Sequence, residues 1–175
     1  MEKESMDEKM IFAFGGSFNP PHVGHTMAIQ SMLDMGAARV HVFVRINEGV
    51  DLVDRKTKIG WFNQMKEKYK DIGWDKVVIH EAVSNNVKGK QYSLATVKNG
   101  INMLHEEAGE IITHYYAGDD YRKFKPFWRL IGGNVKLVIG ARMDGLSSSE
   151  IRNNLDRRRY LLEPFVYEDL KKKEK

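Results

Sequence analysis

The sequence predicts a Rossmann-like α/β fold, in which a doubly wound parallel sheet of about five strands carries helices on both faces. Runs of apolar, β-branched or aromatic residues predict strands at 10–14, 39–44, 77–80, 111–116 and 135–139. Stretches with helical spacing of apolar residues separate these runs, and such alternation is typical of a parallel sheet covered on both faces. Ligands bind such sheets outside the carboxyl ends of the strands, so the loops that follow strands are the expected site.

The helices are predicted by apolar stripes and by their start signals. Residues 23–35 follow a loop rich in Gly and Pro, and Asp54-Arg55-Lys56 is typical of a charged helix start. Two stripes with spacings of three and four residues predict helices, and their members are Ile59, Phe62, Met65 and Tyr69 in the first and Leu94, Val97, Ile101, Leu104 and Ala108 in the second. With no repeat and no linker, residues 1–175 are expected to form one domain, with flexible tails at 1–9 and 171–175.

Composition excludes several classes of protein. The chain is 42% hydrophobic and 30% charged, which is ordinary for a globular protein. It has no apolar run near the roughly 20 residues of a membrane span and no secretory signal, so a cytoplasmic protein without a membrane partner is expected. The absence of cysteine excludes disulfides and thiolate metal sites. The net charge of +4 suits a phosphorylated substrate, and no nucleic-acid motif accompanies the Lys-rich end.

The loop after the first strand, GGSFNPPHVGH at 15–25, is suited to binding phosphate. Gly15 and Gly16 permit a sharp turn and close approach of a ligand to the main chain. His22 and His25 lie about one turn apart at a helix start, where the free N–H groups favour an anion. Each imidazole can donate to a phosphate oxygen and can carry positive charge. A metal pair is less suited, because no carboxylate or third histidine is close in sequence.

A second segment, LSSSEIR at 146–152, follows the last strand. Ser147 or Ser148 can cap a helix with Glu150 as capping partner, which is an ordinary helix start. Hydroxyls and free N–H groups at such a start also bind anions, and the Arg152 guanidinium one turn later can reach the same anion.

A third segment, GDDYRKFKPFW at 118–128, follows the fourth strand. General rules favour a structural interpretation, in which Gly118 turns the chain, Asp119 or Asp120 caps a helix and Trp128 fills the core. An aromatic face could also stack on a planar ring of a ligand.

Taken together, these motifs resemble the HxGH class of nucleotidyltransferases, and within it most closely the nicotinate/nicotinamide mononucleotide adenylyltransferases. LSSSEIR resembles the family's second signature, which cradles the β and γ phosphates of ATP, and Gly118, Asp120, Pro126 and Trp128 stand at the offsets of a third motif. The resemblance implies His22, His25 and Arg152 as catalytic residues. It implies a larger set of ATP contacts: Gly15, Gly16, Ser17, Phe18, His22, His25, Gly118, Asp120, Ser147, Ser148, Ser149 and Arg152.

The mononucleotide side is also implied by resemblance, with two departures. Gln91 to Thr96 (QYSLAT) resembles the family's Ser-Tyr-Thr-x-Asp-Thr, but Ala95 stands where Asp is usual. After the second strand the family often has a Pro-Pro-His-Lys loop, which this chain lacks, and Arg45 is a candidate for the missing positive charge. The expected mononucleotide contacts are Ser17, Asn19, Arg45, Tyr92, Ser93 and Trp128.

The implied reaction joins nicotinate or nicotinamide mononucleotide to the adenylyl group of ATP and releases pyrophosphate. Mg²⁺ is expected to accompany ATP, without a metal site built from the protein alone. A homo-oligomer is compatible with the sequence. The alternatives are a pantetheine-phosphate adenylyltransferase, a cytidylyltransferase, or a nucleotide-binding protein without turnover.

Overall fold

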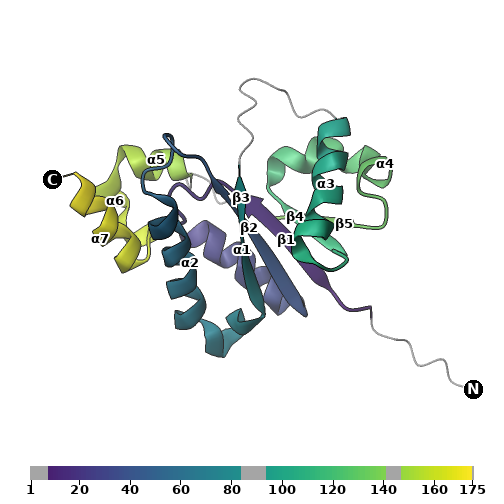
Figure 1. Cartoon of the computed structure of the whole chain (residues 1–175), viewed down its shortest axis with the longest axis horizontal. Helices are drawn as coiled ribbons and strands as arrows, with labels where there is room; N and C mark the ends of the chain where they lie inside the picture. Colours follow the sequence, from purple (N-terminus) through teal and green to yellow (C-terminus); the bar gives the residue numbers. More distant parts are fainter. Residues whose placement is uncertain (1–7, 84–93, 141–146, 175) are drawn as a thin grey trace, which may run out of the picture.

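The sheet is the framework of the molecule, and all five of its strands run parallel. The computed structural model describes residues 8–83, 94–140 and 147–174. The strands are β1 (Ile11–Gly16), β2 (Arg39–Ile46), β3 (Val77–Val83), β4 (His114–Ala117) and β5 (Lys136–Ile139), and they lie in the order β3-β2-β1-β4-β5. This order reverses direction beside β1, and the predicted doubly wound α/β fold is confirmed (Figure 1). The crevice expected to hold a ligand therefore lies where β1 and β4 end.

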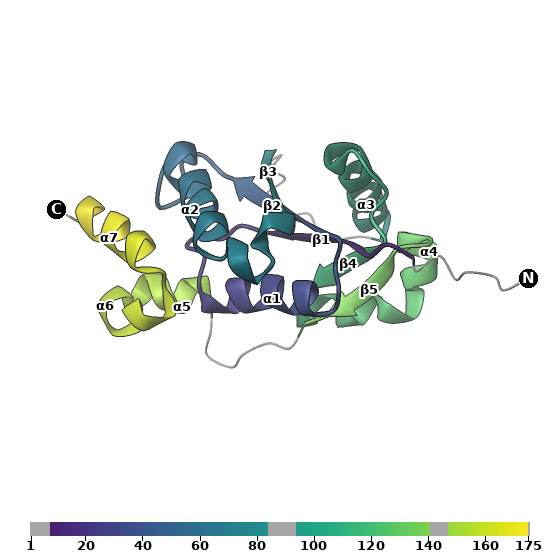
Figure 2. The same ribbon diagram turned by 90° about the horizontal axis from the view of Figure 1, so that it is seen from below.

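Helices cover both faces of the sheet. The elements after β1 and β2 are α1 (Val23–Asp34) and α2 (Arg55–Lys68), followed by the short 3₁₀ turns η1 (Lys70–Ile72) and η2 (Trp74–Lys76). After β3 come α3 (Leu94–Ala108), the 3₁₀ segment η3 (Asp119–Phe127) and α4 (Trp128–Gly132). Figures 1 and 2 show α1 and α3 on opposite sides of the sheet. The chain ends with α5 (Ser148–Asn153), α6 (Leu155–Arg158), η4 (Arg159–Leu161) and α7 (Pro164–Lys173).

Two apolar clusters hold these layers together. Phe12, Val40 and Val42 are fully buried on one face, where they meet α1, α2 and α7. Ile11 and Ala13 belong to the other face, where α3 and α4 pack. Alternate residues of β1 thus enter opposite clusters, as the period of two in a strand requires. No helix among the described residues is long and apolar enough to cross a membrane.

The fourth strand begins three residues later than the sequence pattern predicts. Ile111 is 77% exposed, and the Thr113 hydroxyl accepts the Ile11 N–H at 2.8 Å. The Thr113 N–H also donates to Ile11 O at 2.9 Å, and the paired register of β1 and β4 runs from His114. At its other end, Gly140 N donates to Ala117 O, so β4 and β5 stay paired to the point where they leave the sheet.

The Lys-rich end begins within a helix. Lys171 to Lys173 form the last turn of α7, where positive charge complements the carbonyl end of a helix. Lys171 Nζ lies 3.2 Å from Asp156 Oδ1 and 2.5 Å from Glu174 Oε2. These ion pairs and the packing of α7 keep residues 171–173 helical.

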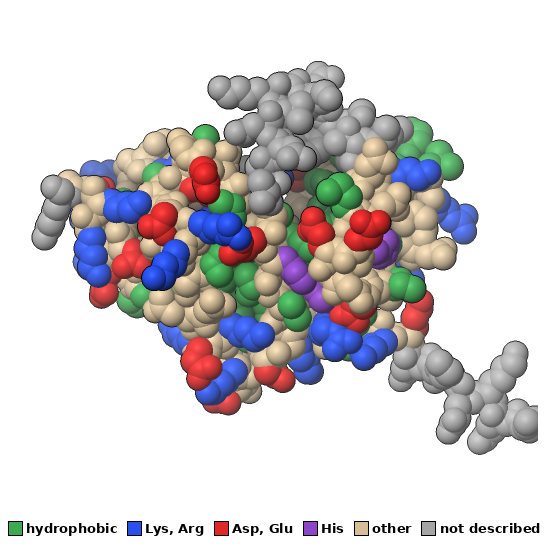
Figure 3. Space-filling view, in the orientation of Figure 1, with side chains coloured by type: hydrophobic (Ala, Val, Ile, Leu, Met, Phe, Trp, Pro, Cys, Tyr) green, Lys and Arg blue, Asp and Glu red, His purple; other side chains and the backbone are tan. Residues whose placement is uncertain are grey.

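A chain of polar side chains joins three elements on the α3 face. His41 of β2 lies 2.7 Å from His80 of β3 and 2.6 Å from a Glu110 carboxylate oxygen. Arg39 binds the same carboxylate through two nitrogens and, together with His41, holds the pKa of Glu110 at about 2. Histidine side chains reach the surface in the middle of the face shown in Figure 3. This network fastens the turn before β4 to β2 and β3.

Candidate functional site

The loop between β1 and α1 is anchored from below by Phe18. Its side chain is 1% exposed and packs edge-on against Phe62 and His25, with ring centroids 5.0 and 4.7 Å away. Its φ of 45° is a left-handed conformation, and a Cβ at Gly16 would lie 3.3 Å from its ring. A glycine is therefore favoured at position 16. Only the main chain of Phe18 can meet a ligand, so the ATP contact expected for it does not involve the side chain.

The two histidines lie against each other at the start of α1. His22 is the N-cap residue, and its Nδ1 accepts the Gly24 N–H at 3.1 Å. His25 Nδ1 accepts the His22 N–H at 3.1 Å, and the ring centroids are 3.8 Å apart. A neutral imidazole carries one ring proton, and both Nδ1 atoms already act as acceptors. Both rings therefore carry their proton on Nε2, which is a donor suited to a phosphate oxygen.

The electrostatics of this pair limit the positive charge that the sequence allows for each imidazole. Burial lowers the pKa of His22 to about 4. Burial, and then the neighbouring His22, hold the pKa of His25 well below its usual value. Both imidazoles are therefore neutral near pH 7. They offer an anion two fixed N–H dipoles instead of charge.

The second segment meets this loop directly. Ser147 caps α5 by accepting the Glu150 N–H, as predicted. Ser148 Oγ donates to Pro20 O at 3.0 Å, and Arg152 Nη1 donates to Asn19 O at 2.5 Å. Arg152 also binds Ser149 Oγ at 3.1 Å. Two segments about 130 residues apart in sequence therefore form one structure, and its cation lies beside the glycine loop.

A cavity of about 670 Å³ lies between α1, the start of α5 and the carboxyl ends of the strands. Six residues predicted to contact ATP line it: His22, His25, Gly118, Asp120, Ser147 and Ser148. Sequence reasoning missed its other walls, which are formed by Phe14, Gly24, Met27, Ala28, Ser31, Tyr116, Ala117, Asp119 and Gly140. The only signal for Tyr116 and Gly140 was their position where strands end.

Gly15, Gly16, Ser17, Ser149 and Arg152 are not among the residues that line this cavity. Ser17 is exposed on the loop beside it, and Arg152 is tied to that loop through Asn19. The contacts from α5 therefore hold both the wall of this cavity and the exposed loop beside it.

The expected mononucleotide contacts are less closely grouped. Asn19 is 8% exposed, and its side chain accepts the Leu52 N–H at 2.9 Å, so it fastens the loop after β2. Trp128 is 7% exposed, donates its indole N–H to Val135 O at 2.6 Å and stacks on Tyr115. Arg45 is exposed at the end of β2. Tyr92 and Ser93 lie outside the described residues.

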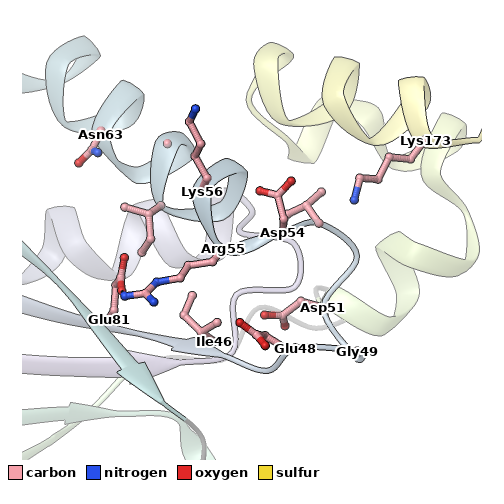
Figure 4. A pocket seen from close by; sticks show the side chains of 13 residues that line it. Ile46, Glu48, Gly49, Asp51, Asp54, Arg55, Lys56, Asn63, Glu81 and Lys173 are labelled. Carbon is pink, nitrogen blue, oxygen red and sulfur yellow. The ribbon is translucent and has the colours of Figure 1, made fainter.

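A second pocket, of about 920 Å³, lies between the loop after β2 and α2 (Figure 4). Both acidic and basic side chains line it, and Arg55 points toward Glu81, with which it forms an ion pair. Beneath this loop Lys58, 1% exposed, places Nζ 2.8 Å from Asp51 Oδ1 and 2.8 Å from Arg45 O. Burial lowers the pKa of Lys58, and Asp51 opposes that shift. The pair holds the loop against the end of β2.

No metal site can be built from the protein's own residues in the part of the chain that the structure describes. No group of three or more His, Cys, Asp or Glu side chains there is placed to hold an ion. Asp119 and Asp120 line the cavity, and Asp119 is paired with Arg122 at 2.7 Å.

Comparisons with known proteins agree with this geometry at the level of fold and family. A family model described as cytidylyltransferase-like matches residues 13–154. No curated protein matches the chain.

Solved structures with the same fold share little sequence with it. A nicotinic acid mononucleotide adenylyltransferase from Plasmodium falciparum, complexed with APC, is 14% identical, with a TM-score of 0.61 over 93% of this chain and 94% of that one. A NadR protein in complex with NR is 19% identical, with a TM-score of 0.60 over 90% of this chain. A bifunctional NMN adenylyltransferase/ADP ribose pyrophosphatase from Francisella tularensis is 12% identical, with a TM-score of 0.64 over 94% of this chain. The match spans 44% of the NadR chain and 49% of the Francisella chain.

Proposed function

The chain belongs to the cytidylyltransferase-like family of nucleotidyltransferases, and on that premise we propose that it transfers the adenylyl group of ATP to nicotinate or nicotinamide mononucleotide. The observation that carries the proposal is the junction of its two signature segments. Ser148 and Arg152 bind the main chain of Pro20 and Asn19, and the two histidines open onto the same cavity. One triphosphate can therefore be held by both segments.

In the proposed reaction an oxygen of the mononucleotide 5′-phosphate attacks the α-phosphorus of ATP. The bond between the α-phosphorus and the bridging oxygen to the β-phosphate breaks, and pyrophosphate leaves with that electron pair. The attacking phosphate is already an anion, so positioning and charge stabilisation supply the catalysis. We assign the Nε2–H groups of His22 and His25 to the oxygens of the α-phosphate. We assign Ser148, Ser149 and Arg152 to the leaving pyrophosphate.

Mg²⁺ is proposed to arrive with ATP. Phosphate oxygens and water would be most of its ligands, because the described part of the chain offers no cluster of its own. Its chemistry there is to neutralise charge on the phosphates. The protein's share is to hold the triphosphate in line with the incoming phosphate.

We propose pyridine mononucleotides as the acceptors for two reasons. The loop GGSFNPPHVGH keeps the two prolines and His22 that distinguish the resembled adenylyltransferases. Two of the solved structures with this fold carry that activity in their names, although at 12–14% identity they establish only the fold. CTP stays in the test because the matching family model is described as cytidylyltransferase-like.

The test is a matrix of pyrophosphate-release assays that pairs ATP or CTP with nicotinate mononucleotide, nicotinamide mononucleotide and phosphopantetheine. We expect release with ATP and a pyridine mononucleotide, and a decrease of about 10²–10³ in kcat for His25→Ala. Pyrophosphate release only in the pairs that contain CTP, or only in those that contain phosphopantetheine, would contradict the proposed substrates. Tight binding of ATP with no release in any pair would contradict the proposed activity.

A further inference from the structure

The wall of the cavity opposite α1 is formed by an unusual pair, Tyr116 at the end of β4 and Gly140 just after β5. Tyr116 projects from the same face of the sheet as Phe14, with which it makes an edge contact at 5.6 Å and 84°. A Cβ built on Gly140 would lie 2.3 Å from the Tyr116 hydroxyl oxygen and 2.6 Å from the ring carbon that bears it. No side chain fits at position 140 while Tyr116 keeps this place.

The hydroxyl of Tyr116 has no hydrogen-bond partner among the residues that the structure describes, although the ring is only partly exposed. By contrast, the buried side chain of Asn19 is paired with the Leu52 N–H. Burial raises the pKa of Tyr116, so the group is a neutral O–H that can donate and accept. A half-buried hydroxyl that faces a cavity without a partner is suited to a ligand atom.

The location of the pair indicates which part of a nucleotide it would meet. The phosphate end of the cavity is marked by His22, His25 and Ser148 beside the β1 loop. From there the cavity extends along α1 to Ser31, about 13 Å at 1.5 Å per residue. Tyr116 and Gly140 lie on β4 and after β5, one and two strands away from β1. A triphosphate held at the histidines would extend its nucleoside over these two residues.

We propose that Tyr116 binds the nucleoside half of the triphosphate through its hydroxyl, and that Gly140 is required because it leaves room for the Tyr116 ring. The inference rests on the proposed ATP site, and it adds a specificity residue that the sequence motifs do not contain. Its distinguishing consequence is that Tyr116 acts on the nucleoside and not on the phosphates. ATP and tripolyphosphate, which lacks a nucleoside, therefore separate its role from that of the signature residues.

The experiment measures the Kd of the full-length chain for ATP and for tripolyphosphate, each with Mg²⁺, by calorimetry. Tyr116→Phe should raise the Kd for ATP about 3–10-fold, which is the effect of one hydrogen bond, and should change the Kd for tripolyphosphate less than about twofold. Gly140→Ala should weaken ATP more than about tenfold, because the new methyl group displaces the ring. In a Tyr116→Ala background the same Gly140→Ala change should have less than about twofold effect, because the ring it would strike is gone.

The matched control is Tyr160→Phe, which removes a hydroxyl from a side chain that is 71% exposed and outside the cavity. This variant should leave the Kd for both ligands unchanged. Equal affinity of wild type and Tyr116→Phe for ATP would overturn the inference, and so would a parallel loss of ATP and tripolyphosphate binding. Tyr116→Phe keeps the ring and its packing, so this arm does not depend on whether Gly140→Ala folds.

The proposed reaction is tested separately by pyrophosphate release from the same wild-type sample. Tyr116→Phe could weaken the binding of ATP selectively while the wild type releases no pyrophosphate with any mononucleotide. That result would support the role of Tyr116 and contradict the proposed activity. A wild-type protein that binds ATP no more tightly than tripolyphosphate would overturn the role of Tyr116, whatever the outcome of the release assay.

Discussion

The Arg152 guanidinium donates to the main-chain oxygen of Asn19 at 2.5 Å, across 133 residues of sequence. The Asn19 side chain in turn accepts the Leu52 N–H at 2.9 Å. One residue of the glycine loop therefore joins α5 to the loop after β2. These two contacts hold the cation beside the proposed triphosphate site.

Arg152→Ala should lower kcat/KM for pyrophosphate release by about 10²–10³, because it removes a charged donor assigned to the leaving group. Arg152→Lys should recover only part of this loss, because an ammonium lacks the planar fork that binds two oxygens. The control is Arg157→Ala, which removes an exposed cation from the neighbouring helix α6. Equal losses in the two alanine variants would show that only net charge matters.

His22 predicts a pH dependence of stability. Its pKa is about 4 in the folded chain and about 6.5 when unfolded, so the unfolded chain binds the proton first. The contribution of this neutral ring is complete above about pH 7 and is lost as the pH falls from 6.5 towards 4. Between about pH 7.5 and about pH 5 the loss amounts to about 2 kcal/mol of unfolding free energy.

Urea unfolding of wild type and His22→Asn at both pH values measures the contribution of His22 to the unfolding free energy. Asn is a good N-cap residue, so the start of α1 is retained while the titrating group is removed. The variant should lose less stability on acidification than wild type does. A residual slope is expected, because burial also lowers the pKa of His25, His80 and His114. Identical slopes would contradict the lowered pKa of His22.

The sequence predicted the sheet well because each strand is short, apolar and bounded by turn residues. Within β1, Ile11 and Phe12 belong to opposite clusters, as neighbouring residues of a strand do. The sequence could not predict that the Thr113 hydroxyl accepts the Ile11 N–H, because that contact joins residues 102 apart.

The site was predictable only where a motif names it. His22, His25, Ser147 and Ser148 do line one cavity, but their charge state depends on burial, which a local sequence pattern does not report. Tyr116 looks like any residue of an apolar strand. The role that we propose for its hydroxyl depends on Gly140, just after β5, which leaves room for the ring. Such relations exist in the folded chain alone.

Lys58→Met should destabilise the protein by about 3–5 kcal/mol, because Asp51 would then be a buried carboxylate without its ammonium partner. The double variant Lys58→Met/Asp51→Asn should be closer to wild type, because neither charge remains buried. Urea unfolding measures both, with Lys56→Met, an exposed lysine of the same helix, as the control within about 0.5 kcal/mol. Equal stability of Lys58→Met and wild type would show that this pair does not hold the loop.

A substitution at Trp128 can separate a role in the core from the stacking role that the family resemblance implies. The indole is 7% exposed, and a Cβ at Gly132 would lie 2.5 Å from its Nε1, so the ring is enclosed by its own helix as well as by Tyr115. Trp128→Phe loses the hydrogen bond to Val135 O and part of the ring. We expect a loss of about 1–3 kcal/mol in unfolding free energy and a change of less than about twofold in the mononucleotide KM.

The comparison is made on one preparation of each protein, with urea unfolding and pyrophosphate release measured in parallel. Phe127→Leu is the control, because Phe127 is the 51% exposed neighbour of Trp128 and its replacement should affect neither quantity. A mononucleotide KM that rises about tenfold or more in Trp128→Phe, with stability unchanged, would assign the indole to the pyridine ring instead of the core. Burial on both faces makes the opposite result the expected one, because a stacking platform needs one face free.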